Sequence, residues 1–194
     1  MKRVDDRRWG LRYLTALLVL NLGAGIGMAE QEPLYDFSDP RATADWTAIN
    51  DGVMGGVSSG GVRSTDDGTA LFSGRLSLES NGGFSSIRSR PRRWDLGERS
   101  GIAIRIRGDG RAYKLNLRTD ASFDGIVYRV PFTTIEGDWQ TLLISFEEFQ
   151  ASFRGRAVPE APPLNPARIT SFGVLISDKQ EGPFRLEIAW IAAY

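Results

Sequence analysis

Hydrophobic and polar residues alternate along most of the chain after residue 30. Short alternating runs are separated by turns that contain Gly, Asn or Asp, which is typical of an antiparallel β-sandwich or barrel. The predicted strands cover residues 69–78, 83–90, 101–108, 111–119, 125–132, 139–146, 168–177 and 184–192. Helical periodicity is limited to short stretches at 39–49 and 145–153, and the proline-rich segment 158–166 predicts a surface loop. The pattern therefore predicts one all-β domain over residues 30–194.

The dipeptide Asp109-Gly110 predicts a β-hairpin between two of these strands. It is favoured in two-residue turns, and such a turn would place Ile106 opposite Tyr113. The next pairs would be Ile104 with Leu115 and Ile102 with Leu117. All six apolar side chains would then share one face, whereas a three-residue loop would mix the faces. The segment NGGF at 81–84 predicts a second hairpin turn.

The opposite face of the predicted hairpin is basic. It would carry Arg105, Arg107, Lys114, Asn116 and Arg118, with Arg129 added if the following strand pairs alongside. Like charges that face each other on paired strands are destabilising unless something neutralises them. Two interpretations stay open. The face is either solvated and balanced by acids of neighbouring strands, such as Glu187, or it is a basic shelf that receives an acidic partner or an anionic ligand.

Residues 1–29 form a segment of a different kind. Five basic residues precede an uncharged run at 13–27, and Gly27 and Ala29 are spaced like a signal-peptidase site before Glu30. The run is shorter than the roughly 20 apolar residues of a membrane-spanning helix. The segment therefore predicts a cleaved export signal and an exported, periplasmic domain. Membrane association through an uncleaved segment is the alternative.

The composition excludes several classes of function. Basic and acidic side chains are balanced at 24 each, which does not favour a nucleic-acid partner. The chain has no Cys and no His, so it lacks thiolate metal sites, cysteine nucleophiles and the commonest general base. We therefore expect a protein that is not an enzyme, with no catalytic residues, no cofactor and no bound metal. A hydrolase that uses only Asp and Glu is the remaining catalytic hypothesis.

The stretch NDGVMGGVSSGG at 50–61 is rich in glycine but does not have the spacing of a phosphate-binding loop. A P-loop requires Lys and Ser or Thr directly after its last glycine, whereas Val62 and Arg63 stand here. The glycines also do not give the dinucleotide fingerprint. We expect no nucleotide, and a loop that adopts positive φ several times. Met54 in this loop is expected in the core, with an exposed contact as the alternative.

Two further loops, FRGR at 153–156 and SDKQEGPF at 177–184, concentrate charge beside glycine. Binding residues often lie on loops of a rigid sandwich. Asp178 and Glu181 alone are weak evidence for Ca²⁺, so a surface salt bridge with Lys179 or Arg185 is favoured. The candidate binding residues are Asp51, Met54, Arg105, Arg107, Lys114, Arg118, Arg154, Arg156, Asp178, Lys179 and Glu181.

Several blocks occur in the order of a known family, among them WTAINDGVMGGVS, GDGRAYKLNLRTD, WQTLLISFEEFQASFRGR and ISDKQEGPFRLEIAWI. The chain resembles the complex I intermediate-associated protein 30 family, named for a mitochondrial assembly factor of NADH:ubiquinone oxidoreductase, over nearly all of 34–194. The resemblance implies an antiparallel jelly-roll β-sandwich of the galactose-binding-domain-like type. It also implies a non-enzymatic chaperone or scaffold for partly built membrane complexes, and it supplies no catalytic residues.

We therefore expect a protein partner, for example an intermediate of a membrane complex. We expect neither a nucleic acid nor a nucleotide as a ligand. The alternative is a carbohydrate-binding module, because jelly-roll sandwiches often hold sugars against aromatic side chains. The aromatic residues available for that role are Trp46, Trp94, Trp139, Trp190 and Tyr128, although each is more typical of packing.

Overall fold

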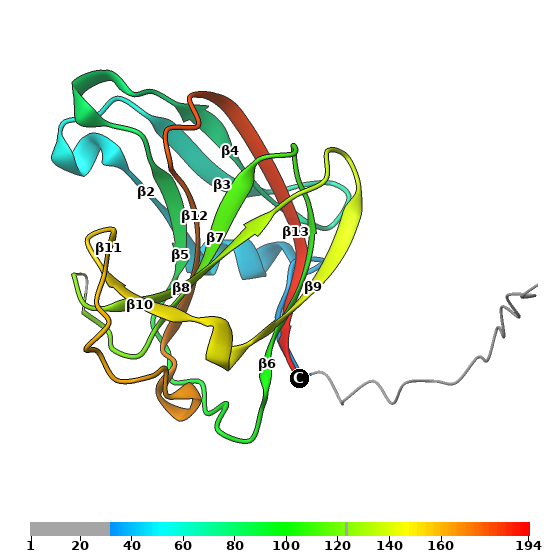
Figure 1. Cartoon of the computed structure of the whole chain (residues 1–194). Helices are drawn as coiled ribbons and strands as arrows, with labels where there is room; N and C mark the ends of the chain where they lie inside the picture. Colours follow the sequence, from blue (N-terminus) through cyan, green and yellow to red (C-terminus); the bar gives the residue numbers. More distant parts are fainter. Residues whose placement is uncertain (1–31, 123) are drawn as a thin grey trace, which may run out of the picture.

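The computed structural model describes residues 32–122 and 124–194 and contains two antiparallel β-sheets that form a sandwich (Figure 1). One sheet has six strands, in the order β3 (Ser59–Ser64), β4 (Ala70–Leu76), β13 (Gly182–Ala193), β6 (Gly101–Arg107) and β9 (Trp139–Ser145), with β1 (Glu32–Asp36) also paired to β13. The other has seven, in the order β11 (Arg156–Ala157), β10 (Gln150–Phe153), β8 (Val127–Thr133), β7 (Ala112–Arg118), β12 (Ser171–Ile176), β5 (Ser85–Ser89) and β2 (Trp46–Asn50). The predicted all-β jelly-roll sandwich is confirmed.

Alternation of side chains builds the core between the sheets. In β7, buried Tyr113, Leu115 and Leu117 alternate with half-buried polar residues, so one face of the strand points inward. β6 and β13 supply apolar side chains from the opposite sheet, including Ile104 and Leu186. Each fully buried aliphatic side chain contributes about 1.5–3 kcal/mol of transfer free energy, so this continuous core is the main source of stability.

The predicted hairpin at Asp109-Gly110 is wrong. β6 pairs with β13 and β9, whereas β7 pairs with β8 and β12, so the turn carries the chain from one sheet to the other. The Asp109 carboxylate holds this corner, because it accepts hydrogen bonds from the Tyr113 hydroxyl at 3.0 Å and from the backbone N–H of Arg185 at 2.8 Å. The segment 81–84 is likewise no hairpin turn, since it joins β4 of one sheet to β5 of the other.

The alternation nevertheless identifies the buried side chains correctly. All six apolar residues of the predicted hairpin lie in the core. In a sandwich the inner faces of both sheets line the same core, so strands in opposite sheets show the same pattern as strands in a hairpin. The period of a strand determines which side chains point inward but not which strand lies beside it.

The predicted helical stretches contain only short 3-10 turns. The segment 39–49 divides into η1 (Pro40–Asp45) and β2, and the segment 145–153 divides into η4 (Phe146–Glu148) and β10. The other turns are η2 (Asp51–Met54), η3 (Glu79–Asn81) and η5 (Pro166–Arg168). Across 32–122 and 124–194, no helix has the length and apolar character needed to cross a membrane. The predicted leader at 1–29 lies outside the described residues.

Candidate functional site

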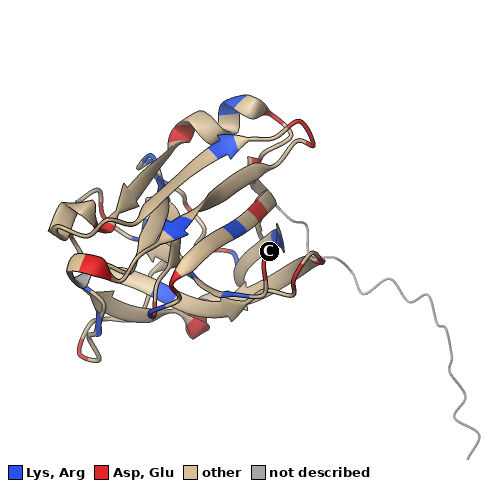
Figure 2. Cartoon of the chain, turned by 90° about the horizontal axis from the view of Figure 1, so that it is seen from above, with Lys and Arg blue, Asp and Glu red and all other residues tan. Residues whose placement is uncertain are grey.

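The residues of the predicted basic shelf lie on two different sheets. Arg105 and Arg107 belong to β6 in the six-stranded sheet, whereas Lys114 and Arg118 belong to β7 in the seven-stranded sheet. The shelf as predicted is therefore wrong, because the hairpin that would have joined the two strands does not form. Over the molecule, basic and acidic groups are interspersed on both layers (Figure 2). The two outer faces have to be considered separately.

On the six-stranded sheet, Arg107 and Arg185 have a counter-charge. Glu187 of β13 is only 2% exposed and forms ion pairs with Arg107 at 2.8 Å and Arg185 at 2.7 Å. Burial acts to raise the pKa of Glu187, but the hydrogen bonds and positive charges of the two arginines hold it below its usual value. Arg105 donates to the Thr141 hydroxyl at 3.1 Å, and its guanidinium lies 5.5 Å from the ring centre of Trp139.

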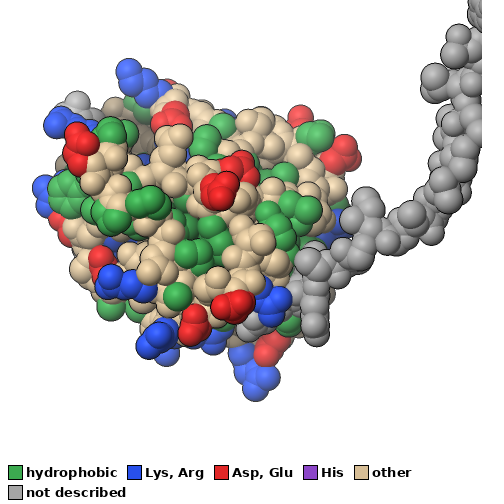
Figure 3. Space-filling model, turned by 60° about the horizontal axis from the view of Figure 1, so that its bottom comes forward, with side chains coloured by type: hydrophobic (Ala, Val, Ile, Leu, Met, Phe, Trp, Pro, Cys, Tyr) green, Lys and Arg blue, Asp and Glu red, His purple; other side chains and the backbone are tan. Residues whose placement is uncertain are grey.

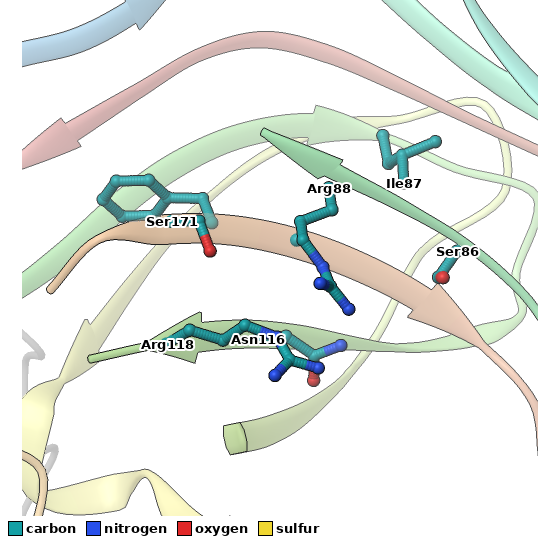
Figure 4. A pocket seen from close by; sticks show the side chains of 8 residues that line it. Ser86, Ile87, Arg88, Asn116, Arg118 and Ser171 are labelled. Atoms are coloured by element: carbon teal, nitrogen blue, oxygen red, sulfur yellow. The ribbon is translucent and has the colours of Figure 1, made fainter. Parts of the chain in front are cut away.

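On the seven-stranded sheet, three half-buried arginines form what we call the arginine cluster: Arg88 on β5, Arg118 on β7 and Arg129 on β8. The strand register brings them together. Gly173 of β12 lies between Arg88 and Asn116, and Arg129 is the partner of Asn116 on the other side. Figure 4 shows Arg88 reaching across β12 toward Asn116 and Arg118.

A small cavity lies within the cluster. Its volume is about 30 Å³, and its lining includes Arg88, Asn116, Arg118, Ser171 and Gly173. The two residues of β12 leave this space open, because serine is small and glycine has no side chain. A Cβ atom added at Gly173 would lie 2.9 Å from the carbonyl oxygen of Ile87, so the position does not accept a larger residue without a shift of the backbone. The cavity is therefore lined by the basic side chains of Arg88 and Arg118 and by the small residues of β12.

Burial lowers the pKa of all three arginines of the cluster. Burial, followed by the positive charge of Arg88, lowers the pKa of Arg118 to about 10, and the nearby charge of Arg129 acts in the same direction. Burial likewise lowers the pKa of Arg88 and of Arg129. Arg118 donates to the backbone carbonyl of Gly125 at 3.3 Å. Three partly desolvated cations at one place create a local field that favours an anion.

Three polar atoms of this face are buried without a partner in the part of the chain that the structure describes. They are Nε of Arg129, the side-chain oxygen of Asn116 and the hydroxyl of Ser152 on β10. Buried polar atoms normally have a hydrogen-bond partner, and exceptions in a native fold often mark a binding function. The acids that act on the cluster are Asp120 and Asp124 near Arg118 and Asp178 near Arg129. These acids offset part of the positive charge, and none of them is among the residues that line the cavity.

Lys114 lies on the same face but has its own counter-ion. Its ammonium group is 2.7 Å from the Asp178 carboxylate and 3.1 Å from the Ser177 hydroxyl. The hydrogen bond from Lys114 and its charge keep the pKa of Asp178 below the usual value. Lys179 and Glu181 of the same loop are exposed. Within residues 32–122 and 124–194, no group of three Asp, Glu, His or Cys side chains could hold a metal ion.

Asp51 is a buried anchor and is not available to a partner. Its carboxylate is fully buried and accepts hydrogen bonds from the Ser58 hydroxyl and from the backbone N–H groups of Ser58, Gly83 and Phe84. Burial acts to raise its pKa, but these hydrogen bonds together hold it below the usual value. A Cβ atom at Gly56 would lie 2.4 Å from the Asp51 carboxyl carbon. The glycine is thus required by close packing around Asp51.

The loop that follows Asp51 adopts positive φ only once, at Gly55, and not several times as predicted. Met54 is 67% exposed, so the expectation that it lies in the core is wrong. Its backbone belongs to η2, which Asp51 fixes, and this leaves the methionine side chain in solvent with Val53 and Val57. Of the remaining candidates, Arg154 forms an ion pair with Asp124, and Arg156 is exposed on β11.

The lower loops form a second hollow. It has a volume of about 440 Å³ and is lined by Phe146, Phe149, Leu164, Arg99 and other residues of η4 and of the proline-rich loop. Figure 3 shows hydrophobic side chains across the middle of this side of the molecule, with basic side chains mostly toward its margin. The hollow has no cluster of charges comparable with the arginine cluster.

The aromatic residues proposed for sugar binding do not line the arginine face. Trp46 and Tyr128 are buried in the core, and Trp139 packs beneath Arg105 and Arg107 on the six-stranded sheet. Trp94 is stacked against Arg92, with 3.6 Å between the guanidinium carbon and the ring centre. In strands β5, β7, β8 and β12 of the seven-stranded sheet, none of the outward positions carries an aromatic side chain.

The fold is a jelly-roll β-sandwich of the galactose-binding-like type. In fold, the chain is similar to the family 11 carbohydrate-binding module of a cellulosomal cellulase of Clostridium thermocellum, with a TM-score of 0.63 and 16% identity over 84% of this chain and 93% of that one. A domain of the agarase AgWH50C is also similar, with a TM-score of 0.56 and 13% identity over 84% of this chain and 24% of that one. At these identities the likeness concerns the fold alone.

The chain belongs to the complex I intermediate-associated protein 30 (CIA30) family, which matches residues 35–188. It is 30% identical over 84% of its length to "Complex I intermediate-associated protein 30, mitochondrial" of Drosophila melanogaster, and 29% identical over 86% of its length to the protein of that name in Mus musculus. It covers 62% and 57% of those two proteins, respectively, so it spans about three-fifths of their length.

The names of these relatives contradict the prediction of an exported or periplasmic domain, because they point to a mitochondrial protein. An arginine-rich segment followed by an uncharged run does not separate the two kinds of targeting segment by itself, since mitochondrial transit peptides are also rich in arginine.

Proposed function

We propose that this protein is a non-enzymatic assembly factor that holds a protein partner, an intermediate of a membrane complex, on the outer face of the seven-stranded sheet. The single observation that carries this proposal is the group of half-buried arginines on this face: burial and nearby positive charge lower the pKa of Arg118, and Nε of Arg129 is buried without a hydrogen-bond partner among the described residues. Arginine is enriched at protein interfaces because its planar guanidinium pairs with carboxylates and packs against apolar surface. Membership of the family makes an intermediate of complex I the first candidate partner.

The properties of the acidic residues support a non-enzymatic role. A general acid of the glycosidase type requires a carboxyl group whose pKa is raised. The pKa values of Asp51, Asp178 and Glu187 are instead lowered, and each carboxylate is held by hydrogen bonds or by basic side chains. These carboxylates are therefore unsuited to donate a proton near neutral pH.

The test is a replacement experiment in cells that lack the endogenous protein. A tagged full chain is expressed, mitochondrial membranes are separated on native gels, and the proteins that co-migrate with the tag are identified by mass spectrometry. We expect subunits of a complex I intermediate to co-migrate, and the intermediate to accumulate when the protein is absent. Normal assembly of complex I without the protein, together with no co-migrating subunits, would contradict the proposal.

Carbohydrate binding, the alternative, draws support only from the likeness of fold. The outward positions of β5, β7 and β12 carry basic, polar, small and aliphatic residues in place of the aromatic platform that sugar binding favours. A glycan array distinguishes the two functions. Saturable binding of one glycan, with no effect of the protein on complex I assembly, would favour the carbohydrate-binding module.

A further inference from the structure

We propose that the free edge of β9 is a docking site for an extended segment of a partner protein, which adds one strand to the six-stranded sheet. β9 (Trp139–Ser145) is the last strand of that sheet, and among the described residues it pairs only with β6. Figure 1 shows β9 at the rim of the sandwich. The site lies on the other sheet from the arginine cluster, so the inference goes beyond the proposed function.

Alternate residues of β9 direct their backbone groups away from β6. The backbone N–H of Phe146 donates to the carbonyl oxygen of Ser100 at 3.0 Å, and from this pair every second residue of β9 bonds to β6. Leu142 belongs to the bonded set. Thr141 and Leu143 belong to the other set, whose N–H and C=O groups point outward. Within residues 32–122 and 124–194, no backbone hydrogen bond joins these outward groups to another strand.

The sequence of β9 does not protect this edge. Native sheets protect their edge strands with charged side chains, proline, bulges or very short strands. The seven residues WQTLLIS contain no charge, no proline and no glycine, and their pairing with β6 has no register shift. The nearest charged residues along the chain, Asp138 and Glu147, lie outside the strand. An edge of this kind is a template for a further strand.

The other edge strands of the described residues carry such protection. β1 contains Pro33, and its pairing is interrupted by a bulge between Pro33 and Tyr35. β11 has only two residues, Arg156–Ala157. β2 and β3 cover each other, since the side-chain amide of Asn50 donates to the carbonyl oxygen of Gly60 at 3.1 Å. β9 is therefore the exception among the described edges.

Apolar side chains lie on both faces of β9. Leu142 packs partly against the core, whereas Leu143, on the opposite face, is 61% exposed. A strand with one face in water usually carries polar side chains on that face, and apolar side chains on both faces are typical of a covered strand. A residue paired with Leu143 in an added strand would have its side chain beside Leu143. We therefore expect the docked segment to place an apolar side chain there.

The chemistry and the extent of the edge favour an extended segment over a helix or a second copy of this chain. Outward N–H and C=O groups in strand register are matched by another extended backbone, whereas a helix bonds its own backbone groups internally. Seven residues span about 24 Å. Two folded subunits joined only along this line would form a narrow contact, while a stable interface buries about 1,200–2,000 Å². A single segment gains its affinity from the main-chain hydrogen bonds themselves.

A hollow at one end of the edge offers a place for a side chain of the segment. Ser145, the last residue of β9, lines this hollow together with Phe146, Phe149 and Leu164. In strand addition the backbone bonds provide affinity, and pockets beside the strand provide specificity. The lining residues favour an apolar side chain at that end of the docked segment.

The test measures hydrogen exchange of single backbone amides by NMR in the purified full chain. The probe is the blocked hexapeptide Lys-Thr-Val-Thr-Val-Thr, and the control is the same peptide with every peptide nitrogen methylated, which keeps the side chains and removes the donors. With the probe in excess, we expect exchange at Thr141 and Leu143 to slow roughly tenfold or more, and exchange at Leu142, already bonded to β6, to change little. Unprotected Thr141 and Leu143 amides at millimolar peptide, or equal protection by the methylated peptide, would overturn the docking site.

Two variants of Leu143 separate the backbone from the side chain. Leu143→Pro removes an outward N–H that β6 does not use, so the fold should form, and peptide binding should weaken roughly tenfold or more. Leu143→Ala keeps the N–H and should weaken binding only about threefold. Peptide binding at wild-type strength in Leu143→Pro would contradict the proposal. If Leu143→Pro does not fold, the methylated peptide on the wild type makes the same comparison.

The free protein distinguishes the other occupants. Slow exchange at Thr141 and Leu143 without peptide would show that the chain itself covers the edge, and protection that rises with protein concentration would show a second copy there. Either result would overturn a partner segment as the occupant. Peptide binding at β9 without co-migration of complex I subunits would leave this site standing and the assembly role wrong. Co-migration without peptide binding would leave the assembly role standing and this site wrong.

Discussion

The two outer faces of this sandwich both carry arginines, but they differ in the charged residues that surround those arginines. On the six-stranded sheet, Arg107 and Arg185 flank the buried carboxylate of Glu187, so the positive charge is compensated within the chain. On the seven-stranded sheet, Arg88 and Arg118 line a small cavity close to Arg129, and Asp120 and Asp124 act on Arg118. The arginines of the first face therefore hold a buried acid, whereas those of the second face are partly desolvated beside like charges.

A short alternating pattern does not distinguish these two situations. Arg105 and Arg118 occupy equivalent outward positions in adjacent strands of the sequence, and both faces are half-buried. The difference arises from the neighbouring strands. β13 brings Glu187 next to β6, whereas β12 places Gly173 and Ser171 next to β7. The predictions below test whether compensated and uncompensated charges behave differently.

The largest effect is expected at Asp51, whose buried carboxylate accepts hydrogen bonds from the backbone and from a hydroxyl. Asp51→Asn removes the negative charge that four donors share, and in either orientation the amide N–H₂ faces at least one N–H donor where an acceptor stood. We expect the free energy of unfolding to fall by about 3 kcal/mol. Urea denaturation measures this change, and Met54→Ala, an exposed neighbour, is the control. Equal stability of Asp51→Asn and the control would show that the buried carboxylate does not hold the loop.

Glu187→Gln tests compensation on the six-stranded sheet. The substitution leaves Arg107 and Arg185 without a counter-charge, and we expect a loss of about 2 kcal/mol at pH 7. Because the pKa of Glu187 is lowered in the fold, its contribution is present above the ordinary carboxyl value of 4.5 and is lost as the pH falls through the lower folded value.

The pH dependence provides the check. The difference in stability between the wild type and Glu187→Gln should shrink below pH 4.5, with Glu181→Gln, on an exposed side chain, as the control. A difference that stays constant down to strongly acidic pH would mean that the ion pairs of Glu187 do not contribute to stability.

Arg118→Gln tests whether the arginine cluster lowers the stability of the fold. Removal of one of three like charges relieves repulsion and desolvation, while the long hydrogen bond to Gly125 and the weaker attraction of Asp120 and Asp124 are lost. We expect stability to stay unchanged or to rise by up to about 1 kcal/mol. The matched variant Arg107→Gln should lose stability, since it breaks an ion pair with a buried acid. Similar losses in both variants would remove the distinction between the two faces.

The smallest effect is expected from salt. Sodium chloride screens the repulsion within the arginine cluster, so a rise from low to moderate ionic strength should stabilise the wild type by about 0.5 kcal/mol more than Arg118→Gln. Thermal unfolding at several salt concentrations measures the difference. Identical salt dependence of the two proteins would indicate that the cluster is already neutral.

Sequence reasoning identified the fold class and most of the strands, because alternation is a local property that survives whichever strands become neighbours. It placed Ile104 and Leu115 in the core correctly. It failed at Asp109-Gly110, where the same turn residues serve a corner between sheets. Pairing is a long-range property, and a single alternating pattern agrees with several pairings.

The candidate site was likewise predicted only in part from the sequence. Arg118 was identified from its outward position, and Arg129 was considered as an addition, but Arg88 was missed. Arg88 lies in a strand 30 residues earlier, and only the pairing of β5 with β12 brings it to the cavity. The available signal was its outward position in the strand predicted at 83–90. Asp51 was selected for its place beside a glycine loop, and only the fold reveals that its carboxylate points inward.

The most direct test of the central claim compares the two faces in the same cells. The double variant Arg88→Gln/Arg118→Gln and the single variant Arg105→Gln are expressed at equal levels, and the recovery of complex I subunits with each tagged protein is measured by quantitative mass spectrometry. We predict that recovery falls roughly tenfold for the double variant, as for the loss of a central charged contact, and stays at the wild-type level for Arg105→Gln. Equal recovery with the double variant and the wild type would contradict the account.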